Sequence, residues 1–281
     1  MNIKILVVLL IVAIILFIIL FVICLYKINI NNNSHSDKTG LVGIYYINMD
    51  KSKDRRVHME KQLFKQGLVG IRQSGIDGKQ INLEEYKFFL KKFNNHFVKR
   101  PDRIGHLGCF LSHLEIYKNF LKTDKPYCLV LEDDVSFLTN SFKKVLNDTI
   151  YKFQSKNWDI ILFGYHIDQD WNKKHKENNK DLFLKDDIIH NINYFTGLHC
   201  YLINRRTAIK LLKKLRQPSW YIDWEISKYA YNNELNIYGV FPPVVCQPAA
   251  FRVNINDINY RYKCKFFKTT TNSDKYVEPK T

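Results

Sequence analysis

Three consecutive carboxylates follow a short apolar run in the stretch Tyr127–Val135. The run Cys128–Leu131 is apolar, as expected for a buried strand, and Glu132, Asp133 and Asp134 come directly after it. Acids at the end of a buried strand repel one another and are costly to desolvate, so a divalent cation would relieve the repulsion. Mg²⁺ and Mn²⁺ prefer oxygen ligands, usually carboxylates together with substrate phosphates. The stretch predicts a metal–diphosphate site at a strand end, with a solvated acidic turn as the alternative.

Basic and imidazole side chains lie near the ends of two other predicted elements. Arg55 and Arg56 fall in the first turn of a helix predicted after the apolar strand Leu41–Asn48. Arginines there suit a phosphate or a carboxylate. A solvated helix start is an equally good interpretation, in which positive charge is slightly unfavourable for the helix dipole. His113 lies one helical turn after Cys109, beside an apolar stripe, and is either a hydrogen-bonded core residue or a substrate contact.

A second acidic segment comes late in the chain. Asp223 and Glu225 are flanked by Trp220 and Trp224. A helix is predicted to begin near Ile222, so one interpretation of Asp223 is a cap of that helix. The two tryptophans either stack on sugar rings or fill the core.

These residues are spread over the elements of a predicted α/β domain, because strand–loop–helix units open α/β sheets. The segment Ser74–Gly78, which contains Asp77, is a turn-rich end to a short strand. Asn204 is predicted to cap the helix that follows the strand Tyr194–Ile203. The other predicted elements are the helices Leu83–Phe93, Cys109–Leu121 and Phe142–Phe153 and the strands Trp158–Gly164 and Ile237–Val240.

The N-terminal region is apolar without a break from Ile5 to Leu25. At about 1.5 Å rise per residue, these roughly 21 residues span about 31 Å, enough for one bilayer crossing. The run is longer than the apolar core of a cleaved signal peptide and lacks its small-residue cleavage site. We predict an uncleaved membrane anchor over residues 1–27, a flexible stem over 28–40, a domain over 41–250 and a basic tail over 251–281.

The net charge and the cysteine spacing limit the classes of binding partner and metal site that the sequence indicates. The chain of 281 residues has 43 Lys and Arg against 27 Asp and Glu, a net charge of +16 that favours anionic partners. The lysines are scattered over helix faces, which argues against a dedicated nucleic-acid surface. The cysteines are widely spaced without a Cys-x-x-Cys pair, so neither a zinc site nor a dense disulfide framework is indicated.

Four stretches, in their order and spacing, resemble glycosyltransferase family 25, the family of lipopolysaccharide-biosynthesis and procollagen galactosyltransferases. Each stretch alone has low specificity, and the match as a whole covers roughly Ile44 to Gln247. The four stretches are Tyr46–Asp50 with Arg55 and Arg56, Gly108–His113, Leu131–Val135, and Pro218–Asp223.

The resemblance implies a nucleotide-sugar-binding fold of the GT-A type, a mixed and mostly parallel sheet flanked by helices. It puts the family's Asp-x-Asp motif on Glu132, Asp133 and Asp134, with Glu in place of the first Asp. Which carboxylate holds the metal is therefore left open. Asp134 is expected to bind Mn²⁺ or Mg²⁺, with Glu132 in the metal site or nearer the ribose. The implied contacts of the nucleotide-sugar are Asn48, Arg55, Arg56, Asp77, His113, Glu132 and Asp133.

The implied activity is inverting transfer of a sugar, galactose or glucose, from a UDP-sugar to a hydroxyl of a glycan or a hydroxylysine-type protein acceptor. A cation would neutralise the diphosphate leaving group, and a carboxylate would deprotonate the acceptor hydroxyl. Asp223 matches the family's acid after the segment that begins at Pro218, so it is the candidate base, with the helix cap as the alternative. Family members vary in acceptor, and the resemblance supplies no particular one.

Two other classes of function stay open. One is a membrane-tethered sugar- or anion-binding protein that keeps the fold without catalysis, although the intact acidic triplet argues against it. The other is a basic protein that binds anionic lipid or nucleic acid by charge, with binding that weakens steeply in salt and ignores Mn²⁺. Lys4 and Lys27 flank the apolar run, so the positive charges on its two sides are nearly balanced and leave the membrane orientation open. The domain is expected on the non-cytoplasmic side, in the secretory pathway, or on a cytoplasmic membrane face.

Overall fold

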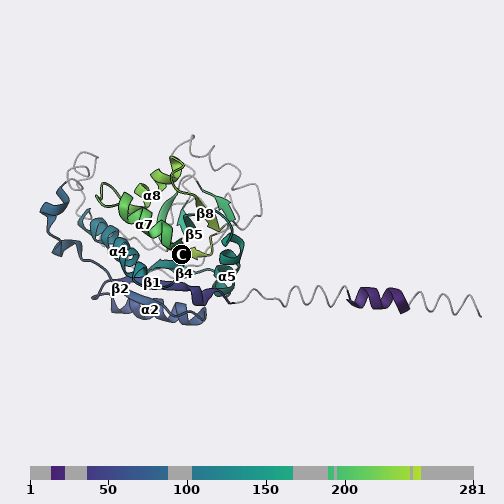
Figure 1. Cartoon of the computed structure of the whole chain (residues 1–281). Helices are drawn as coiled ribbons and strands as arrows, with labels where there is room; N and C mark the ends of the chain where they lie inside the picture. Colours follow the sequence, from purple (N-terminus) through teal and green to yellow (C-terminus); the bar gives the residue numbers. More distant parts are fainter. Residues whose placement is uncertain are drawn as a thin grey trace, which may run out of the picture. The chain divides into compact units, whose positions relative to one another are not determined.

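The chain divides into two compact units, Met1–Lys38 and Thr39–Thr281. The computed structural model describes residues 14–22, 37–87, 103–166, 189–192, 195–240 and 243–247 (Figure 1). Residues 14–22 are helical with exposed apolar side chains. Across the described ranges, no helix combines the length and the apolar character that a membrane crossing requires. Residues 1–13 and 23–27 of the predicted anchor, residues 28–36 of the predicted stem and the tail over 251–281 lie outside those ranges.

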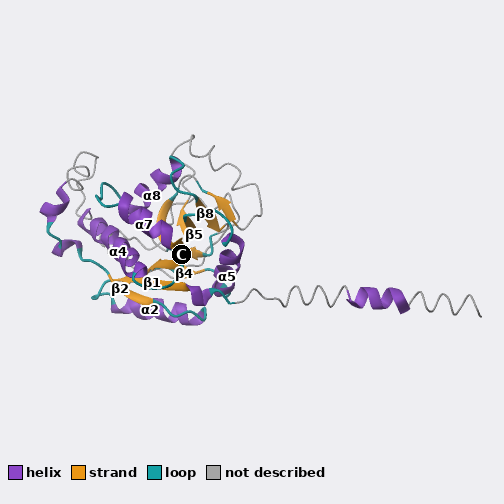
Figure 2. Cartoon of the chain, viewed as in Figure 1, coloured by secondary structure: helices purple, strands orange, loops and turns teal. Residues whose placement is uncertain are grey.

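One mixed sheet forms the centre of the second unit (Figure 2). In the part of the chain that the structure describes, its strand order is β2-β1-β3-β7-β5-β8-β6. β1 is parallel to β2 and to β3, and β5 is parallel to β8, whereas β7 and β6 run against their neighbours. This confirms the mixed, mostly parallel sheet. The strands are β1 (Val42–Asn48), β2 (Ile71–Ser74), β3 (Tyr127–Glu132), β5 (Ile160–His166), β6 (Ile189–Asn191), β7 (Thr196–Asn204) and β8 (Ile237–Val240).

Helices cover both faces of this sheet because its central strands are apolar on both sides. Along β3, Cys128 and Val130 pack into one buried cluster, and Leu129 and Leu131 into the other, as the alternation of side chains requires. The first cluster contains residues of α4 (Arg103–Leu121), α7 (Arg205–Lys214) and α8 (Ile222–Tyr231), and the second those of α2 (Lys53–Lys65) and α5 (Phe142–Phe153). The sheet is therefore buried between two layers of helices.

Several smaller elements complete the unit. Two-residue strands β4 (Ser136–Phe137) and β9 (Val245–Cys246) pair antiparallel just after the acidic triplet, a pairing that the sequence did not predict. Short 3₁₀ helices lie at Thr39–Leu41, Gly78–Gln80 and Leu83–Tyr86. The helix predicted over residues 83–93 therefore begins as a 3₁₀ turn, and residues 88–93 lie outside the described part.

Two glycines allow α4 to approach the turn after β2. A Cβ on Gly78 would lie 1.8 Å from the carbonyl oxygen of Ile104, and one on Gly108 would lie 2.3 Å from that of Ile76. The two backbones therefore touch where only glycine fits. Ser112 strengthens the contact, because its Oγ accepts the N–H of Ile76 at 2.8 Å. This contact sets the position of α4, and with it the position of the Cys109 and His113 side chains.

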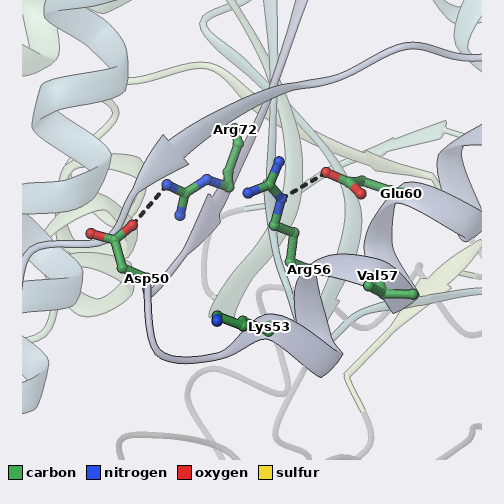
Figure 3. A pocket seen from close by; sticks show the side chains of 6 residues that line it. All are labelled: Asp50, Lys53, Arg56, Val57, Glu60 and Arg72. Atoms are coloured by element: carbon green, nitrogen blue, oxygen red, sulfur yellow. Dashed lines mark hydrogen bonds and ion pairs between the residues drawn. The ribbon is translucent and has the colours of Figure 1, made fainter.

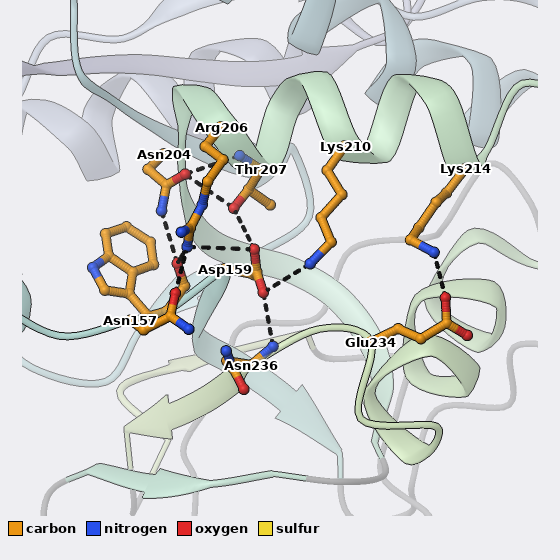
Figure 4. A network of polar contacts seen from close by, with 10 residues as sticks. Asn157, Asp159, Asn204, Arg206, Thr207, Lys210, Lys214, Glu234 and Asn236 are labelled. Atoms are coloured by element: carbon orange, nitrogen blue, oxygen red, sulfur yellow. Dashed lines mark hydrogen bonds and ion pairs between the residues drawn. The ribbon is translucent and has the colours of Figure 1, made fainter.

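A buried aspartate ties α7 to the sheet (Figure 4). Asp159 accepts hydrogen bonds from Thr207 Oγ1 at 3.2 Å, Lys210 Nζ at 3.3 Å and the backbone N–H of Asn236 at 2.9 Å. A buried carboxylate is stable only with such partners. Asn204 caps α7 as predicted, because its Oδ1 accepts the N–H of Thr207 at 2.9 Å.

A chain that begins at Thr39 is expected to be soluble and to fold as the second unit does, because the division between the two compact units falls there. Circular dichroism, size-exclusion chromatography and transfer to a small soluble acceptor test this. A matched control that begins at Met49 lacks β1, which pairs with both β2 and β3, and should not fold. If the Thr39 chain precipitates unfolded while the full chain is active in detergent, the boundary is wrong.

Candidate active site

The three carboxylates lie at the carboxyl end of β3, where β1 also ends. β1 and β3 are parallel with Ile47 beside Glu132, so Asn48 and the triplet leave the sheet at the same edge. Glu132 is the last residue of β3, and Asp133 and Asp134 form the turn that follows, with only 6% and 2% of their surface exposed. The acids therefore reach the edge at which ligands usually bind in such sheets.

Arg55 and Asn48 hold two of these acids. Arg55 Nη2, from the first turn of α2, lies 2.5 Å from Asp133 Oδ1 and 2.8 Å from Asp134 Oδ2. Asn48 Nδ2 donates to Asp133 Oδ2 at 2.6 Å and to the carbonyl oxygen of Ser52 at 3.0 Å. The guanidinium of Arg55 thus offsets part of the repulsion among the acids, for which the sequence had indicated only a metal cation. Contact of Arg55 and Asn48 with a nucleotide-sugar stays a prediction.

Gln247 also contacts two acids of the triplet. Its Nε2 atom lies 2.9 Å from Glu132 Oε2 and 3.0 Å from each carboxylate oxygen of Asp134. An amide nitrogen carries two hydrogens, so it serves three oxygens only by sharing them. Three carboxylate oxygens therefore converge on one neutral N–H₂ group.

Burial sets the charge of the triplet. Burial raises the pKa of Asp134 to about 7, where Arg55 opposes the rise and the two neighbouring acids add to it. Burial also raises the pKa of Asp133, against the pull of Arg55. For Glu132 burial acts in the same direction, but His113, His199 and Arg55 together outweigh it and the pKa lies below its usual value. Glu132 is therefore charged at neutral pH, whereas Asp134 loses its proton near neutrality.

His113 is a core residue and also borders the site. Its side chain is fully buried, and Nε2 lies 3.5 Å from Glu132 Oε1. On the other side of the ring, Nδ1 lies 2.7 Å from the hydroxyl of Tyr201, which is 2.6 Å from the hydroxyl of Tyr117. The structure therefore shows His113 as a hydrogen-bonded core residue that faces an acid of the triplet, and its contact with substrate stays a prediction.

Asp223 makes the backbone contacts of a helix start. It lies in the first turn of α8, where its Oδ1 accepts the N–H of Trp224 at 2.9 Å and its Oδ2 accepts the N–H of Gly197 at 2.8 Å. Gly197 has φ +79°, a conformation that favours glycine. Burial raises the pKa of Asp223, the two backbone donors oppose the rise, and the charge of Glu132 adds to it. Tyr221, not Asp223, is the N-cap of α8, so Asp223 stabilises the helix start only through the N–H of Trp224, and its role as base stays a prediction.

The two tryptophans beside Asp223 pack on each other. The rings of Trp220 and Trp224 are 6.3 Å apart between centroids and inclined by 68°. Trp220 also packs against the buried Leu107 of α4. Trp220 therefore packs partly buried against the core, and stacking of either ring on a sugar stays a prediction.

Two other predicted site residues, Asp77 and Arg56, contact residues outside the triplet. Asp77 caps a 3₁₀ turn, where its Oδ1 accepts the N–H of Lys79 at 3.0 Å. Arg56 is exposed and pairs with Glu60 at 2.9 Å. It lines an open pocket of about 330 Å³ with Asp50, Lys53, Val57, Glu60 and Arg72 (Figure 3). The structure therefore separates Arg56 from Arg55, although the two are adjacent in sequence.

Gln247 and Cys109 are the site residues that the sequence missed. Gln247 lies 115 residues after Glu132, and no local pattern connects the two. The signal for Cys109 was its spacing of one helical turn from His113, which is the spacing of neighbours on one helix face. In the structure, ligand atoms of Cys109, His113 and Glu132 lie within 4.8 Å of one another.

The mixed sheet flanked by helices makes this an α/β protein. Its carboxylate triplet lies at the end of one strand. Its family follows from a match over residues 42–226 to the family described as "Glycosyltransferase family 25 (LPS biosynthesis protein)". The chain belongs to glycosyltransferase family 25, which confirms the resemblance seen in its four stretches.

Similar proteins carry names from the same family. A "Glycosyltransferase 25 family member" of Anopheles gambiae is 29% identical over 182 residues, 63% of this chain and 30% of that protein. Human "Procollagen galactosyltransferase 2" is 32% identical over 136 residues, 46% of this chain and 22% of that protein. The chain thus spans less than a third of the length of these relatives.

Solved structures resemble the chain only distantly. The protein A197 from STIV is 16% identical with a TM-score of 0.39, and the match covers 71% of this chain and 81% of that one. Apo mouse xyloside xylosyltransferase 1 is 10% identical with a TM-score of 0.35, covering 69% of this chain and 70% of that one.

Proposed function

We propose that this protein is a metal-dependent inverting glycosyltransferase. It transfers galactose or glucose from a UDP-sugar to a hydroxyl of a glycan or of a hydroxylysine-type protein acceptor. Family membership supports the reaction class. The observation that carries the proposal is the convergence of Glu132 and Asp134 oxygens at the sheet edge, close to the cationic Arg55.

The residues fit a divalent cation. The oxygens that converge on Gln247 Nε2, one from Glu132 and two from Asp134, are the ligand type that Mn²⁺ and Mg²⁺ prefer. They become available to a cation once the amide turns away. We assign the cation to Asp134 and Glu132. When bound, it supplies Lewis-acid stabilisation of the diphosphate leaving group.

The remaining groups orient the reactants. Arg55 lies against Asp133 and Asp134, so its positive charge is already close to the proposed position of the diphosphate. Asn48 and Arg55 together fix the Asp133 carboxylate. Asp223 comes from a different element, α8, as a base on the opposite side of the sugar must. It takes the proton of the acceptor hydroxyl as the sugar is transferred.

The N-terminal run points to a membrane location. We propose that Ile5–Leu25 anchors the chain and that the domain acts on the non-cytoplasmic side, in the secretory pathway, or on a cytoplasmic membrane face. The partners are the UDP-sugar donor, the glycan or glycoprotein acceptor and the membrane, without a specific nucleic acid.

Screening UDP-sugars for hydrolysis and transfer tests the proposal. The full chain is incubated with UDP-galactose, UDP-glucose and other UDP-sugars, with and without Mn²⁺, and release of UDP is measured. Release from one donor that requires Mn²⁺ is the expected result. Absence of release from every donor, with each acceptor class present, would count against the enzyme.

A second candidate is a non-catalytic sugar- or anion-binding protein. The observation in its favour is that Arg55 and Gln247 already contact all three acids of the triplet. Such a protein would bind a UDP-sugar without releasing UDP. Calorimetric titration with the donor, beside the release assay, separates the two candidates.

Asp223→Asn is expected to lower turnover at least about a hundredfold while UDP-sugar affinity stays nearly unchanged, because general-base catalysis contributes about 10²–10⁴-fold. Steady-state kinetics and donor titration measure both quantities. Glu225→Gln, two residues further along α8, is the matched control and should keep activity. A loss of donor affinity alone would make Asp223 a donor ligand, and a loss of thermal stability alone would leave it a cap.

A further inference from the structure

Cys109, His113 and Glu132 form a second group of ligand atoms, of which the proposed metal–diphosphate site uses only Glu132. Cys109 and His113 lie one turn apart on α4, and Glu132 ends β3 opposite them. Their Sγ, imidazole nitrogen and carboxylate oxygen all lie within 4.8 Å of one another. Thiolate, imidazole and carboxylate together are a ligand set typical of Zn²⁺ and Co²⁺, not of Mg²⁺.

The buried nitrogen of His113 points into this group. Among the described residues, His113 Nε2 is a fully buried polar atom without a hydrogen-bond partner. It lies 3.5 Å from Glu132 Oε1. Two ligands about 2.0–2.1 Å from a tetrahedral ion are about 3.3 Å apart. The observed spacing is therefore close to that of two ligands that share an ion.

The opposite side of the imidazole ring is held in place. His113 Nδ1 lies 2.7 Å from the Tyr201 hydroxyl, and Tyr201 continues to Tyr117 at 2.6 Å. When Nδ1–H donates to the Tyr201 oxygen, Nε2 can give up its proton and offer its lone pair to an ion beside Glu132. Metal-bound histidines usually have their second nitrogen fixed by such a hydrogen bond.

We propose that Cys109, His113 and Glu132 bind a borderline-soft divalent cation, Zn²⁺ or Co²⁺, with a fourth position open to water. Cys109 and the Glu132 side chain are partly exposed, so an ion can enter from their side. Binding replaces the thiol proton of Cys109, which passes to solvent. Glu132 uses Oε1 here, whereas its Oε2 faces Gln247 and the proposed diphosphate site. The two sites are thus adjacent and share Glu132, each through a different carboxylate oxygen.

Titration of the reduced full chain with Co²⁺ tests the site. The expected result is one Co²⁺ with a thiolate-to-cobalt charge-transfer band in the near ultraviolet and visible bands of a four-coordinate ion. Zn²⁺ should displace it, and excess Mg²⁺ should not. Cys109→Ala should lose the charge-transfer band, and Glu132→Gln should weaken binding at least about tenfold because a charged ligand is removed.

Cys128→Ala is the matched control, because Cys128 is a free, buried cysteine on β3 outside the group. It should keep the band. Cys109→Ser, which retains a polar side chain, replaces Cys109→Ala if circular dichroism shows that the alanine variant is unfolded. Absence of a charge-transfer band in the natural chain, or its persistence without Cys109, overturns the site. Asp134→Asn should keep the band while losing Mn²⁺-dependent UDP release, so failure of this site and failure of the proposed function are told apart.

Discussion

Asp134→Asn is expected to abolish Mn²⁺-dependent sugar transfer and to leave the fold intact. The substitution keeps the shape of the side chain and removes one of the two charged ligands proposed for the cation. A cation at the leaving group is worth several kcal/mol, and about 1.4 kcal/mol is tenfold in rate, so transfer should fall by about a thousandfold or more. UDP release at limiting Mn²⁺ measures the effect, and activity equal to that of the natural chain would remove this metal site.

The stability of the Asp134→Asn variant can be predicted from the direction of the pKa shift of Asp134. Burial raises the pKa of Asp134 from 3.8 to about 7, so the folded chain holds this proton more tightly than the unfolded chain does. The contribution of Asp134 to stability therefore decreases as pH rises from about 4 to about 7. Asparagine is neutral at every pH. Without metal, Asp134→Asn should be at least as resistant to urea as the natural chain at pH 8.

The same shift predicts how pH affects the metal. A cation binds the carboxylate form of Asp134, so it must displace a proton below pH 7. The Mn²⁺ concentration for half-maximal transfer should therefore fall as pH rises through about 7. In Glu132→Gln, the lost neighbouring charge removes one cause of the raised pKa, so the pKa of Asp134 itself should fall.

Arg55→Met is expected to destabilise the fold by about 3–5 kcal/mol at pH 8. Arg55 is the buried partner of both Asp133 and Asp134, and its removal leaves two desolvated carboxylates without their cation. Urea unfolding followed by circular dichroism measures the loss. Added Mn²⁺ should restore part of it if the triplet binds a cation, because a ligand that binds only the folded chain stabilises that state.

Arg56→Met is the matched control for this experiment. Arg56 is the next residue, and it pairs with Glu60 in an exposed ion pair. Exposed pairs contribute about 0–1 kcal/mol, so this variant should unfold close to the natural chain, with or without Mn²⁺. Equal losses in the two variants would contradict the account of Arg55 as the residue that holds the triplet.

Local patterns in the sequence determined most of the elements and the location of the acids. The helix over Phe142–Phe153 and the strand over Ile237–Val240 have the predicted bounds. Asn204 caps α7 as expected. These predictions hold because apolar periodicity and caps act between residues a few positions apart. The four short stretches likewise identified the family, because its motifs are contiguous in sequence.

Only the tertiary structure decided what surrounds each acid. Arg55 and Arg56 are adjacent in sequence, yet one side chain lies against the triplet and the other on an exposed pocket, because successive helical residues face different directions. Gln247 reaches Glu132 across 115 residues through the pairing of β4 with β9. Cys109 and His113 meet Glu132 because glycines let α4 approach closely. Such contacts join residues far apart in the chain, and the number of residues between two positions does not determine their distance in the fold.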